Sequence, residues 1–326
     1  MAKRNFGDEF GFQTRAVHTG NDVDSETGAI KRPITMANSY ELPYDPSDLN
    51  WSSAGKNLYT RNGGSNQQYL QEKLASLEGG EDCVVLASGV AALSGLFFAL
   101  LKSGDHVVFS SVTYIAVYRL LNELLKDKFG VETTIVDTTD IEKVKAAIRP
   151  NTKLIHIETP GNPTLSISDI EKIAELAHAS GALLSVDNTF ASPFNQRPIE
   201  LGADFTVESL TKYINGHGDA MGGAIIGKKE YLDIIRAQSQ INLGATISPF
   251  NAWLIMRGSV TLPLRMKQHN ENALKVARYL KTVKGVSFVA YPGLEDHPNH
   301  DVAVKQMKNG FGGVLSFGLK ADHDTY

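Results

Sequence analysis

The segment Val207-Glu208-Ser209-Leu210-Thr211-Lys212-Tyr213-Ile214-Asn215-Gly216-His217-Gly218-Asp219 carries one lysine between hydroxyl side chains, directly after a short apolar run. We expect a strand over residues 204–207, which places Lys212 just beyond the carboxyl end of that strand. The amine of such a lysine can form a Schiff base with an aldehyde cofactor, and the hydroxyls can bind its phosphate. Because a solvated loop lysine gives the same local pattern, the rest of the chain must decide between the two interpretations.

Strand-like and helix-like segments alternate through the middle of the chain. This alternation predicts an α/β fold with a mostly parallel sheet flanked by helices. In such sheets ligands bind beyond the carboxyl ends of the strands. The expected strands are residues 84–87, 106–110, 133–136, 154–157, 183–186 and 204–207. The expected helices between them are residues 91–101, 117–125, 141–148 and 170–179, and they are preceded by a helix that Ser65 can cap and Gly79-Gly80 ends.

Residues able to bind a cofactor follow several of these strands. The small-residue turn Ser88-Gly89-Val90 opens a helix, and backbone N–H groups at a helix start bind phosphate well. Tyr114 follows the next strand and can stack on a planar ring. Glu158 and Asn162 lie in a proline-rich turn and present a carboxylate and an amide. Asp187 leaves a fully apolar strand, where a carboxylate needs a partner such as a pyridinium nitrogen.

Composition excludes several other classes of protein. The net charge of -4 gives no electrostatic reason to bind nucleic acid. The longest apolar run, residues 90–101, is too short to span a bilayer, and the first residues lack the apolar core of a signal peptide. Cys83 is the single cysteine, so no intrachain disulfide can form. We therefore expect a cytoplasmic protein without membrane or nucleic-acid partners. No metal site is expected either, because His297 and His300 lack a third ligand nearby.

The ends of the chain differ from its middle. Residues 1–64 lack clean periodicity and predict an extended N-terminal arm, in which Tyr59-Thr60-Arg61 lies in a glycine-rich loop. Residues 65–248 are expected to form a large cofactor-binding domain. Residues 249–326 are expected to form a smaller α+β domain that looks truncated. Its expected helices are residues 251–257 and 264–280, and its expected strands are residues 286–290 and 314–319.

Residues 222–229 have the glycine and lysine spacing of a Walker phosphate-binding loop. The hydroxyl residue after the lysine is missing, and residues 224–226 have the composition of a strand. We therefore reject a nucleotide-binding loop here.

Taken together, these motifs resemble the pyridoxal-phosphate-dependent enzymes of cysteine and methionine metabolism. That family includes cystathionine γ-synthase, cystathionine γ- and β-lyases and methionine γ-lyase. The similarity runs from residue 12 to the last residue, and its strongest part is residues 211–219 around the lysine. The resemblance implies the fold of the aspartate-aminotransferase-like (type I) pyridoxal-phosphate enzymes. It also implies γ-elimination or γ-replacement on sulfur-containing or O-acylhomoserine amino acids, of the cystathionine γ-lyase or γ-synthase type.

The resemblance also implies a role for each candidate residue. Lys212 would bind the cofactor covalently and carry protons, Asp187 would pair with the pyridine nitrogen, and Tyr114 would stack on the ring. Glu158 and Asn162 would lie near the ring and the substrate. The phosphate would be bound by Ser88, Gly89, Val90, Ser209 and Thr211, together with Tyr59 and Arg61 of a neighbouring subunit. A homo-oligomer, a tetramer built from two active dimers, would follow.

Two departures from the family pattern keep alternatives open. Ile115 follows the tyrosine where the family has glycine, and the cysteine that methionine γ-lyases carry two residues after the tyrosine is absent. Family members also continue beyond Tyr326 and place there an arginine that binds the substrate carboxylate. Methionine γ-lyase or cystathionine β-lyase activity is one alternative. A truncated homologue that binds the cofactor without turnover is another.

Overall fold

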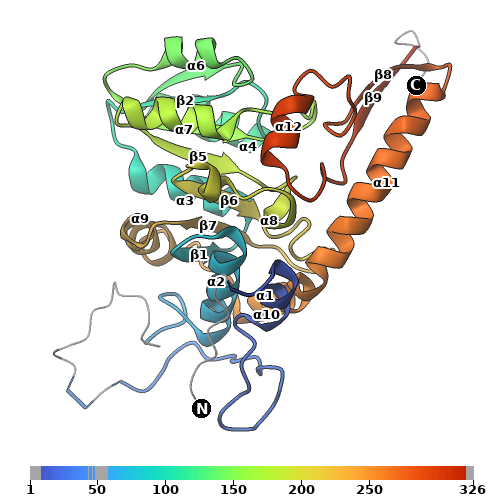
Figure 1. Ribbon diagram of the computed structural model, residues 1–326. Coiled ribbons are helices and arrows are strands. Elements are labelled where there is room, and N and C mark those ends of the chain that lie inside the picture. The colour runs from blue at the N-terminus through green and yellow to red at the C-terminus, as the bar shows by residue number, and fades with distance from the viewer. Residues whose placement is uncertain (1–8, 43, 46, 48–57, 321–326) are drawn as a thin grey trace. The chain divides into compact units, whose positions relative to one another are not determined.

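The computed structural model describes residues 9–42, 44–45, 47 and 58–320. Figure 1 shows the order of its helices and strands along the chain. By their contacts, the residues form two compact units. Unit 1 comprises the described residues of Met1–Lys102 and Asp204–Pro263, and unit 2 those of Ser103–Ala203 and Leu264–Tyr326. The domain boundaries expected at residues 64 and 248 stay a prediction.

Unit 1 contains three buried strands in the order β1 (Asp82–Leu86), β7 (Gly223–Gly227) and β6 (Phe205–Ser209). β7 is antiparallel to both neighbours, so β1 and β6 run in the same direction. The carboxyl ends of β1 and β6 therefore lie at the same edge. The strand expected over residues 224–226 is present as β7, which is why the Walker-like spacing does not form a phosphate loop.

Helices of unit 1 pack against these strands. α2 (Ser65–Glu78) buries Leu70, Leu74 and Leu77, which lie at helical spacing, and it ends at Gly79 with a φ of 76°. α3 contacts β6 and β7, α9 contacts β1, and α10 contacts α2. The bounds of these helices are α3 (Gly89–Leu100), α9 (Lys229–Ile235) and α10 (Pro249–Gly258), with a π-helix over Arg236–Asn242.

One helix of unit 1 was not expected. α1 (Phe12–His18) lies in the segment for which an extended arm was predicted. The guanidinium of Arg15 donates to the carbonyl of Ser76, and Lys73 Nζ donates to Ala16 O at 2.7 Å. These contacts with α2 stabilise a helix too short to be recognised from periodicity.

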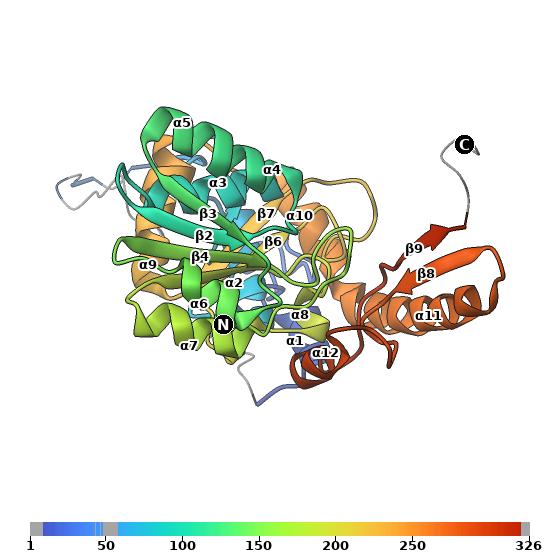
Figure 2. The same cartoon turned by 90° about the horizontal axis from the view of Figure 1, so that it is seen from above.

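Unit 2 contains four parallel strands in the order β5 (Leu183–Asp187), β4 (Thr152–Glu158), β2 (His106–Ser110) and β3 (Glu132–Val136). Figure 2 shows α6 and α7 on one face of these strands and α4 and α5 on the other. The predicted α/β class with a mostly parallel sheet flanked by helices is confirmed. The helices are α4 (Ile115–Tyr118), a π-helix over Arg119–Leu125, α5 (Lys126–Phe129), α6 (Ile141–Ala147), α7 (Ile170–Ala179) and α8 (Ser192–Asn195).

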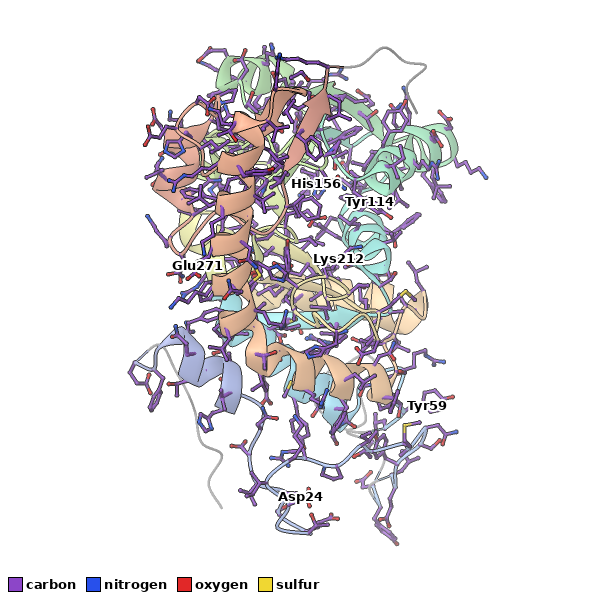
Figure 3. All side chains as sticks on the ribbon, turned by 90° about the vertical axis from the view of Figure 1, so that its right-hand side faces the viewer. Asp24, Tyr59, Tyr114, His156, Lys212 and Glu271 are labelled. Carbon is purple, nitrogen blue, oxygen red and sulfur yellow. The ribbon has the colours of Figure 1, made fainter. Side chains whose placement is uncertain are left out.

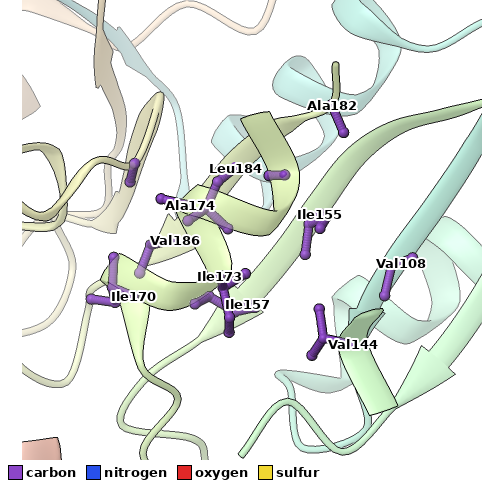
Figure 4. Close-up of a cluster of buried hydrophobic side chains, with 12 residues drawn as sticks. Val108, Val144, Ile155, Ile157, Ile170, Ile173, Ala174, Ala182, Leu184 and Val186 are labelled. Atoms are coloured by element: carbon purple, nitrogen blue, oxygen red, sulfur yellow. The ribbon is translucent and has the colours of Figure 1, made fainter. Parts of the chain in front are cut away.

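The core of unit 2 lies between α7 and its strands (Figure 4). Ile170, Ile173 and Ala177 recur at helical spacing, and all three are fully buried. They pack against Ile155 and Leu184 of the strands. The side chain of Asp169 accepts from Lys172 N and caps α7, so the helix begins where the apolar pattern does.

The C-terminal part of unit 2 consists of α11 (Leu262–Thr282), β8 (Val286–Ala290), α12 (His300–Gln306) and β9 (Ser316–Leu319). β8 and β9 pair antiparallel beside α11 (Figure 1). α12 was not predicted, because its short sequence follows a proline-rich turn. No helix in the described ranges is long and apolar enough to cross a membrane.

Candidate active site

In unit 1, the turn after β1 presents backbone donors. Ser88 Oγ accepts from Ala91 N at 3.1 Å and caps α3, so this hydroxyl already has a partner. The N–H groups of Gly89 and Val90 precede the first helical hydrogen bond, and they have no acceptor among the residues that the structure describes. Two adjacent free donors at the start of a twelve-residue helix fit an anionic group.

This turn lies directly against the end of β6. A Cβ atom built on Gly89 would lie 2.9 Å from Ser209 Cβ and 3.0 Å from Ser209 Oγ. A Cβ on Gly223 would lie 2.0 Å from Ser88 O. Glycine is therefore needed at both positions, and the close approach brings Ser88, Gly89 and Ser209 together, as predicted for a phosphate site.

Lys212 lies in the turn that follows β6, and its side chain is exposed (Figure 3). Lys212 N donates to Ser209 O at 3.1 Å, and Gly216 N donates to Lys212 O at 2.8 Å. The turn is anchored by Ile214, which is buried. Thr211 Oγ1 pairs with the backbone of Gly222 at 3.3 Å, so this hydroxyl braces the turn.

In unit 2, Glu158 and Asp187 end adjacent parallel strands, and their Cα atoms are direct partners in the register of β4 and β5. Glu158 Oε2 accepts from Tyr114 N at 2.5 Å and from Thr113 Oγ1 at 3.3 Å, while Oε1 accepts from Asn162 N at 3.0 Å. Burial of the Glu158 carboxyl group and, as the smaller cause, repulsion from the Asp187 carboxylate raise the pKa of Glu158 to about 8.

Asp187 is 8% exposed, and both hydrogen bonds to its carboxylate come from Thr189. Thr189 Oγ1 and N donate to Oδ1 at 2.6 and 3.1 Å. Within the described part of the chain, Oδ2 receives no hydrogen bond. Burial raises the pKa of Asp187, so a cation placed against Oδ2 would stabilise its ionised form.

Glu158 orders two predicted site residues through their backbones. Tyr114 is the residue before α4, and its side chain is 43% exposed. Asn162 is half-buried in the turn after β4. Thr113 and Thr189 were missed by the sequence reasoning. A threonine two residues after a strand-ending aspartate is a local signal that identifies Thr189, whereas nothing local identifies Thr113 as a partner of Glu158.

Tyr59 and Arg61 lie in unit 1 as an exposed pair. The Arg61 guanidinium is 5.1 Å from the centre of the Tyr59 ring, and Arg61 O accepts from Gln240 Nε2 at 3.1 Å. Both side chains are therefore held on the surface with their polar ends accessible.

The histidines considered for a metal have local partners. His297 Nδ1 accepts from Asn299 N at 3.2 Å, and His300 Nδ1 lies 2.8 Å from Pro292 O. No cluster of three or more His, Cys, Asp or Glu side chains suited to a metal ion occurs in the part of the chain that the structure describes.

Each unit carries groups that suit a part of pyridoxal phosphate. Unit 1 has N–H donors beside a serine for a phosphate and a strand-end lysine for an aldehyde, and unit 2 has a buried carboxylate for a pyridine nitrogen. The fold and these residues define a pyridoxal-phosphate-dependent enzyme. The model of the family "Cys/Met metabolism PLP-dependent enzyme" matches residues 13–326, and the chain belongs to this family. Its cofactor is pyridoxal phosphate, and the resemblance deduced from the sequence is confirmed.

Known proteins similar to this chain are lyases and a synthase. Canavanine gamma-lyase of Rhizobium leguminosarum bv. trifolii is 54% identical over 99% of this chain and 80% of its own length. Cystathionine gamma-synthase of Mycobacterium bovis is 43% identical over 94% of this chain and 78% of its own. The crystal structure of cystathionine gamma-lyase from Lactobacillus plantarum complexed with L-serine is 38% identical, with a TM-score of 0.89 over 95% of this chain and 79% of that one.

Proposed function

We propose that this protein is a γ-lyase that removes a heteroatom leaving group from the γ carbon of an amino acid, and that its substrate is canavanine. The observation that carries the proposal is the 54% identity with canavanine gamma-lyase over 99% of the chain. In canavanine a guanidine group is bonded through oxygen to the γ carbon. Elimination would break that carbon–oxygen bond and release hydroxyguanidine. The remaining four-carbon chain would then take up one water, which gives either homoserine or 2-oxobutyrate and ammonia.

The roles proposed for Lys212 and Asp187 follow from their positions at strand ends. When bound, pyridoxal phosphate withdraws electrons from the α carbon of the substrate, which makes the protons on the neighbouring carbons acidic. Lys212 Nζ binds the cofactor and, when the substrate amine replaces it, takes the proton from the α carbon and then one from the β carbon. Asp187 Oδ2 holds the proton of the pyridine nitrogen in place.

Tyr114 is proposed to stack on the ring and to give its hydroxyl proton to the departing heteroatom. Glu158 supports this role by fixing the backbone of Tyr114, and also that of Asn162, which is proposed to bind the substrate carboxylate. Gly89 and Val90 are proposed to donate their N–H groups to the phosphate.

Ile115 is proposed to select the substrate. It directly follows Tyr114, its side chain is 54% exposed, and it occupies a position where glycine is usual in the resembled family. We propose that this branched side chain reduces the space available to the leaving group of the substrate. Pocket shape of this kind discriminates between leaving groups by about 1–3 kcal/mol, which is enough to separate canavanine from cystathionine, whose leaving thiol is larger.

A substrate panel tests the proposal. Purified protein loaded with pyridoxal phosphate is offered canavanine, cystathionine, methionine, and acylhomoserine with cysteine. Hydroxyguanidine, 2-oxobutyrate, homoserine, thiols and cystathionine are measured. We expect kcat/KM for canavanine to exceed that for every other substrate by about tenfold or more. Efficient use of acylhomoserine and cysteine, with canavanine inert, would instead support a synthase. Cofactor binding without turnover of any substrate would identify a silent homologue.

Tyr59 and Arg61 are proposed to bind the phosphate of a neighbouring subunit, which makes the active protein a homo-oligomer. Mixed oligomers of Arg61→Ala and Lys212→Ala subunits test this directly. If the sites are shared, a fraction of the mixed sites contains neither substitution, and activity returns on mixing. Two inactive variants that stay inactive in proven mixed oligomers would contradict shared sites. The cytoplasmic location expected from the sequence stays a prediction.

A further inference from the structure

Gln196 is a buried amide between the segments that follow β4 and β5. Its side chain is 1% exposed, and Nε2 donates to Thr159 O and to Asn188 Oδ1, both at 2.9 Å. Asn188 Nδ2 in turn donates to Gln196 O at 2.9 Å. Thr159 directly follows Glu158, and Asn188 directly follows Asp187. One amide is therefore bonded to the neighbour of each carboxylate residue.

A residue of α12 helps to fix the orientation of the Gln196 side-chain amide. The carbonyl of Thr159 can only accept, so the NH₂ group of Gln196 must face it. Gln196 Oε1 then accepts from Gln306 Nε2 at 2.9 Å, and Gln306 Oε1 accepts from Ile170 N at 3.3 Å. Gln306 is 3% exposed. Each donor and acceptor of the Gln196 amide thus has a defined partner, which is the condition for a rigid buried network.

The same two segments are joined by their backbones. Thr159 N donates to Asp187 O at 3.3 Å, which is long for this kind of bond. The side chain of Gln196 adds two shorter bonds across the gap and closes a ring that includes both strand ends. Gln196 thereby links the turns that follow Glu158 and Asp187 just beyond the last register pair of β4 and β5.

We propose that Gln196 is a positioning residue that fixes the spacing between Glu158 and Asp187 through its three side-chain hydrogen bonds. Asp187 is proposed to pair with the pyridine nitrogen, and Glu158 accepts from the Tyr114 backbone. The Asp187 carboxylate and Tyr114 keep one relative position only if the two turns keep their separation. Glutamine is required because it combines two donors with one acceptor. Glutamate at this position would lack both N–H donors. Methionine would keep only the approximate length of the side chain and could form none of the three hydrogen bonds. The inference rests on the proposed cofactor roles of the two carboxylates.

Cofactor binding, rather than activity, is the primary measurement. Pyridoxal phosphate is titrated into cofactor-free wild-type protein and Gln196→Met, and visible-region circular dichroism of the reloaded proteins reports the orientation of the bound ring. We expect the dissociation constant to rise about tenfold in Gln196→Met, the size of effect typical for an outer hydrogen-bonding partner, and the dichroism band to change. Gln306→Met leaves both N–H donors of Gln196 in place. It should therefore change the dissociation constant and the dichroism band in the same direction as Gln196→Met, but by a smaller amount.

Asn270→Leu is the matched control in the same unit. Asn270 is also a buried amide, and its side chain exchanges hydrogen bonds with Asn195 at 2.8 and 3.1 Å and donates to Asn309 O at 2.9 Å. Losing these bonds should lower the melting temperature without changing cofactor affinity or dichroism.

Wild-type affinity and dichroism in Gln196→Met would overturn the proposal, and so would equal changes in Gln196→Met and Asn270→Leu. If Gln196→Met fails to fold, Gln306→Met decides the question, and unchanged measurements there would overturn the proposal. A wild-type protein that binds pyridoxal phosphate but turns over no γ-substituted amino acid would refute the proposed function and leave this test intact.

Discussion

Glu158→Gln is expected to change how the stability of the cofactor-free protein depends on pH. Glu158 is 7% exposed and lies opposite Asp187 in the β4–β5 register. Burial and the neighbouring carboxylate raise the pKa of Glu158 from 4.5 to about 8. Between these two values the folded protein holds a proton that the unfolded chain has lost. The free energy of unfolding therefore falls as pH rises through this range.

The size of the effect follows from the same values. A pKa raised from 4.5 to about 8 corresponds to about 5 kcal/mol at most. Because Asp187 titrates together with Glu158, the substitution should remove only part of this dependence, on the order of 3 kcal/mol. The glutamine NH₂ group will also face a backbone N–H, which costs about 1–3 kcal/mol at every pH. The slope with pH therefore separates the electrostatic effect from the lost hydrogen bond.

Urea unfolding between about pH 5 and pH 8 measures this slope for the wild type, Glu158→Gln and Glu175→Gln. Glu175 is exposed on α7 and serves as the matched control. The stability advantage of the wild type over Glu158→Gln should shrink by about 3 kcal/mol across this range, whereas its difference from Glu175→Gln should stay constant. A wild-type advantage over Glu158→Gln that does not vary with pH would refute the reasoning.

Three further substitutions have defined outcomes. Lys212→Ala should abolish covalent binding, so the visible spectrum resembles free pyridoxal phosphate and the steady-state rate falls by about 10³-fold or more. Gly89→Ala places Cβ 2.9 Å from Ser209 Cβ; it should cost about 1–3 kcal/mol in urea unfolding and weaken cofactor binding, and wild-type affinity would contradict the proposed phosphate site. Burial lowers the pKa of Lys73 from 10.5 to about 7, so the unfolded chain binds the extra proton between these values and wild-type stability rises with pH there. Thermal melts of Lys73→Met should lack this rise, and an unchanged rise would show that Lys73 is not its source.

The strands were largely predictable because each is a buried apolar run between turn residues. The bounds of β2 and β8 match the predicted residues 106–110 and 286–290. β4 extends beyond the predicted run to Thr152 and Glu158. The reason is that backbone pairing with β2 and β5 continues through polar residues, which a hydrophobicity pattern leaves out.

Helices that depend on tertiary contacts were harder to predict. The expected helix over residues 117–125 is an α-turn followed by a π-helix. Residues 236–242 also form a π-helix, where Ser239 Oγ donates to Gly95 O at 2.7 Å. The partner of Ser239 lies far along the chain, and a helical periodicity read from local sequence does not distinguish a π-helix from an α-helix.

The candidate site shows the same division. Lys212, Asp187 and Gly89 could be proposed as site residues because strand ends and small-residue turns are local features of the sequence. The amide partners Gln196 and Gln306 were not, since 110 positions separate them and each has an ordinary local pattern. Side chains that hold a site together are found through long-range contacts.

The pairing of β1 with a strand far along the chain affects when unit 1 can fold. β1 ends at Leu86, whereas its only neighbour among the described strands, β7, begins at Gly223. During synthesis, more than a hundred further residues must therefore be added before β7, which packs against the Ser88–Gly89 turn, exists. Pairing over such a separation is slow and exposes apolar strand edges meanwhile. If Lys212 binds pyridoxal phosphate as proposed, cofactor capture should therefore occur late in synthesis, after β7 has paired with β1.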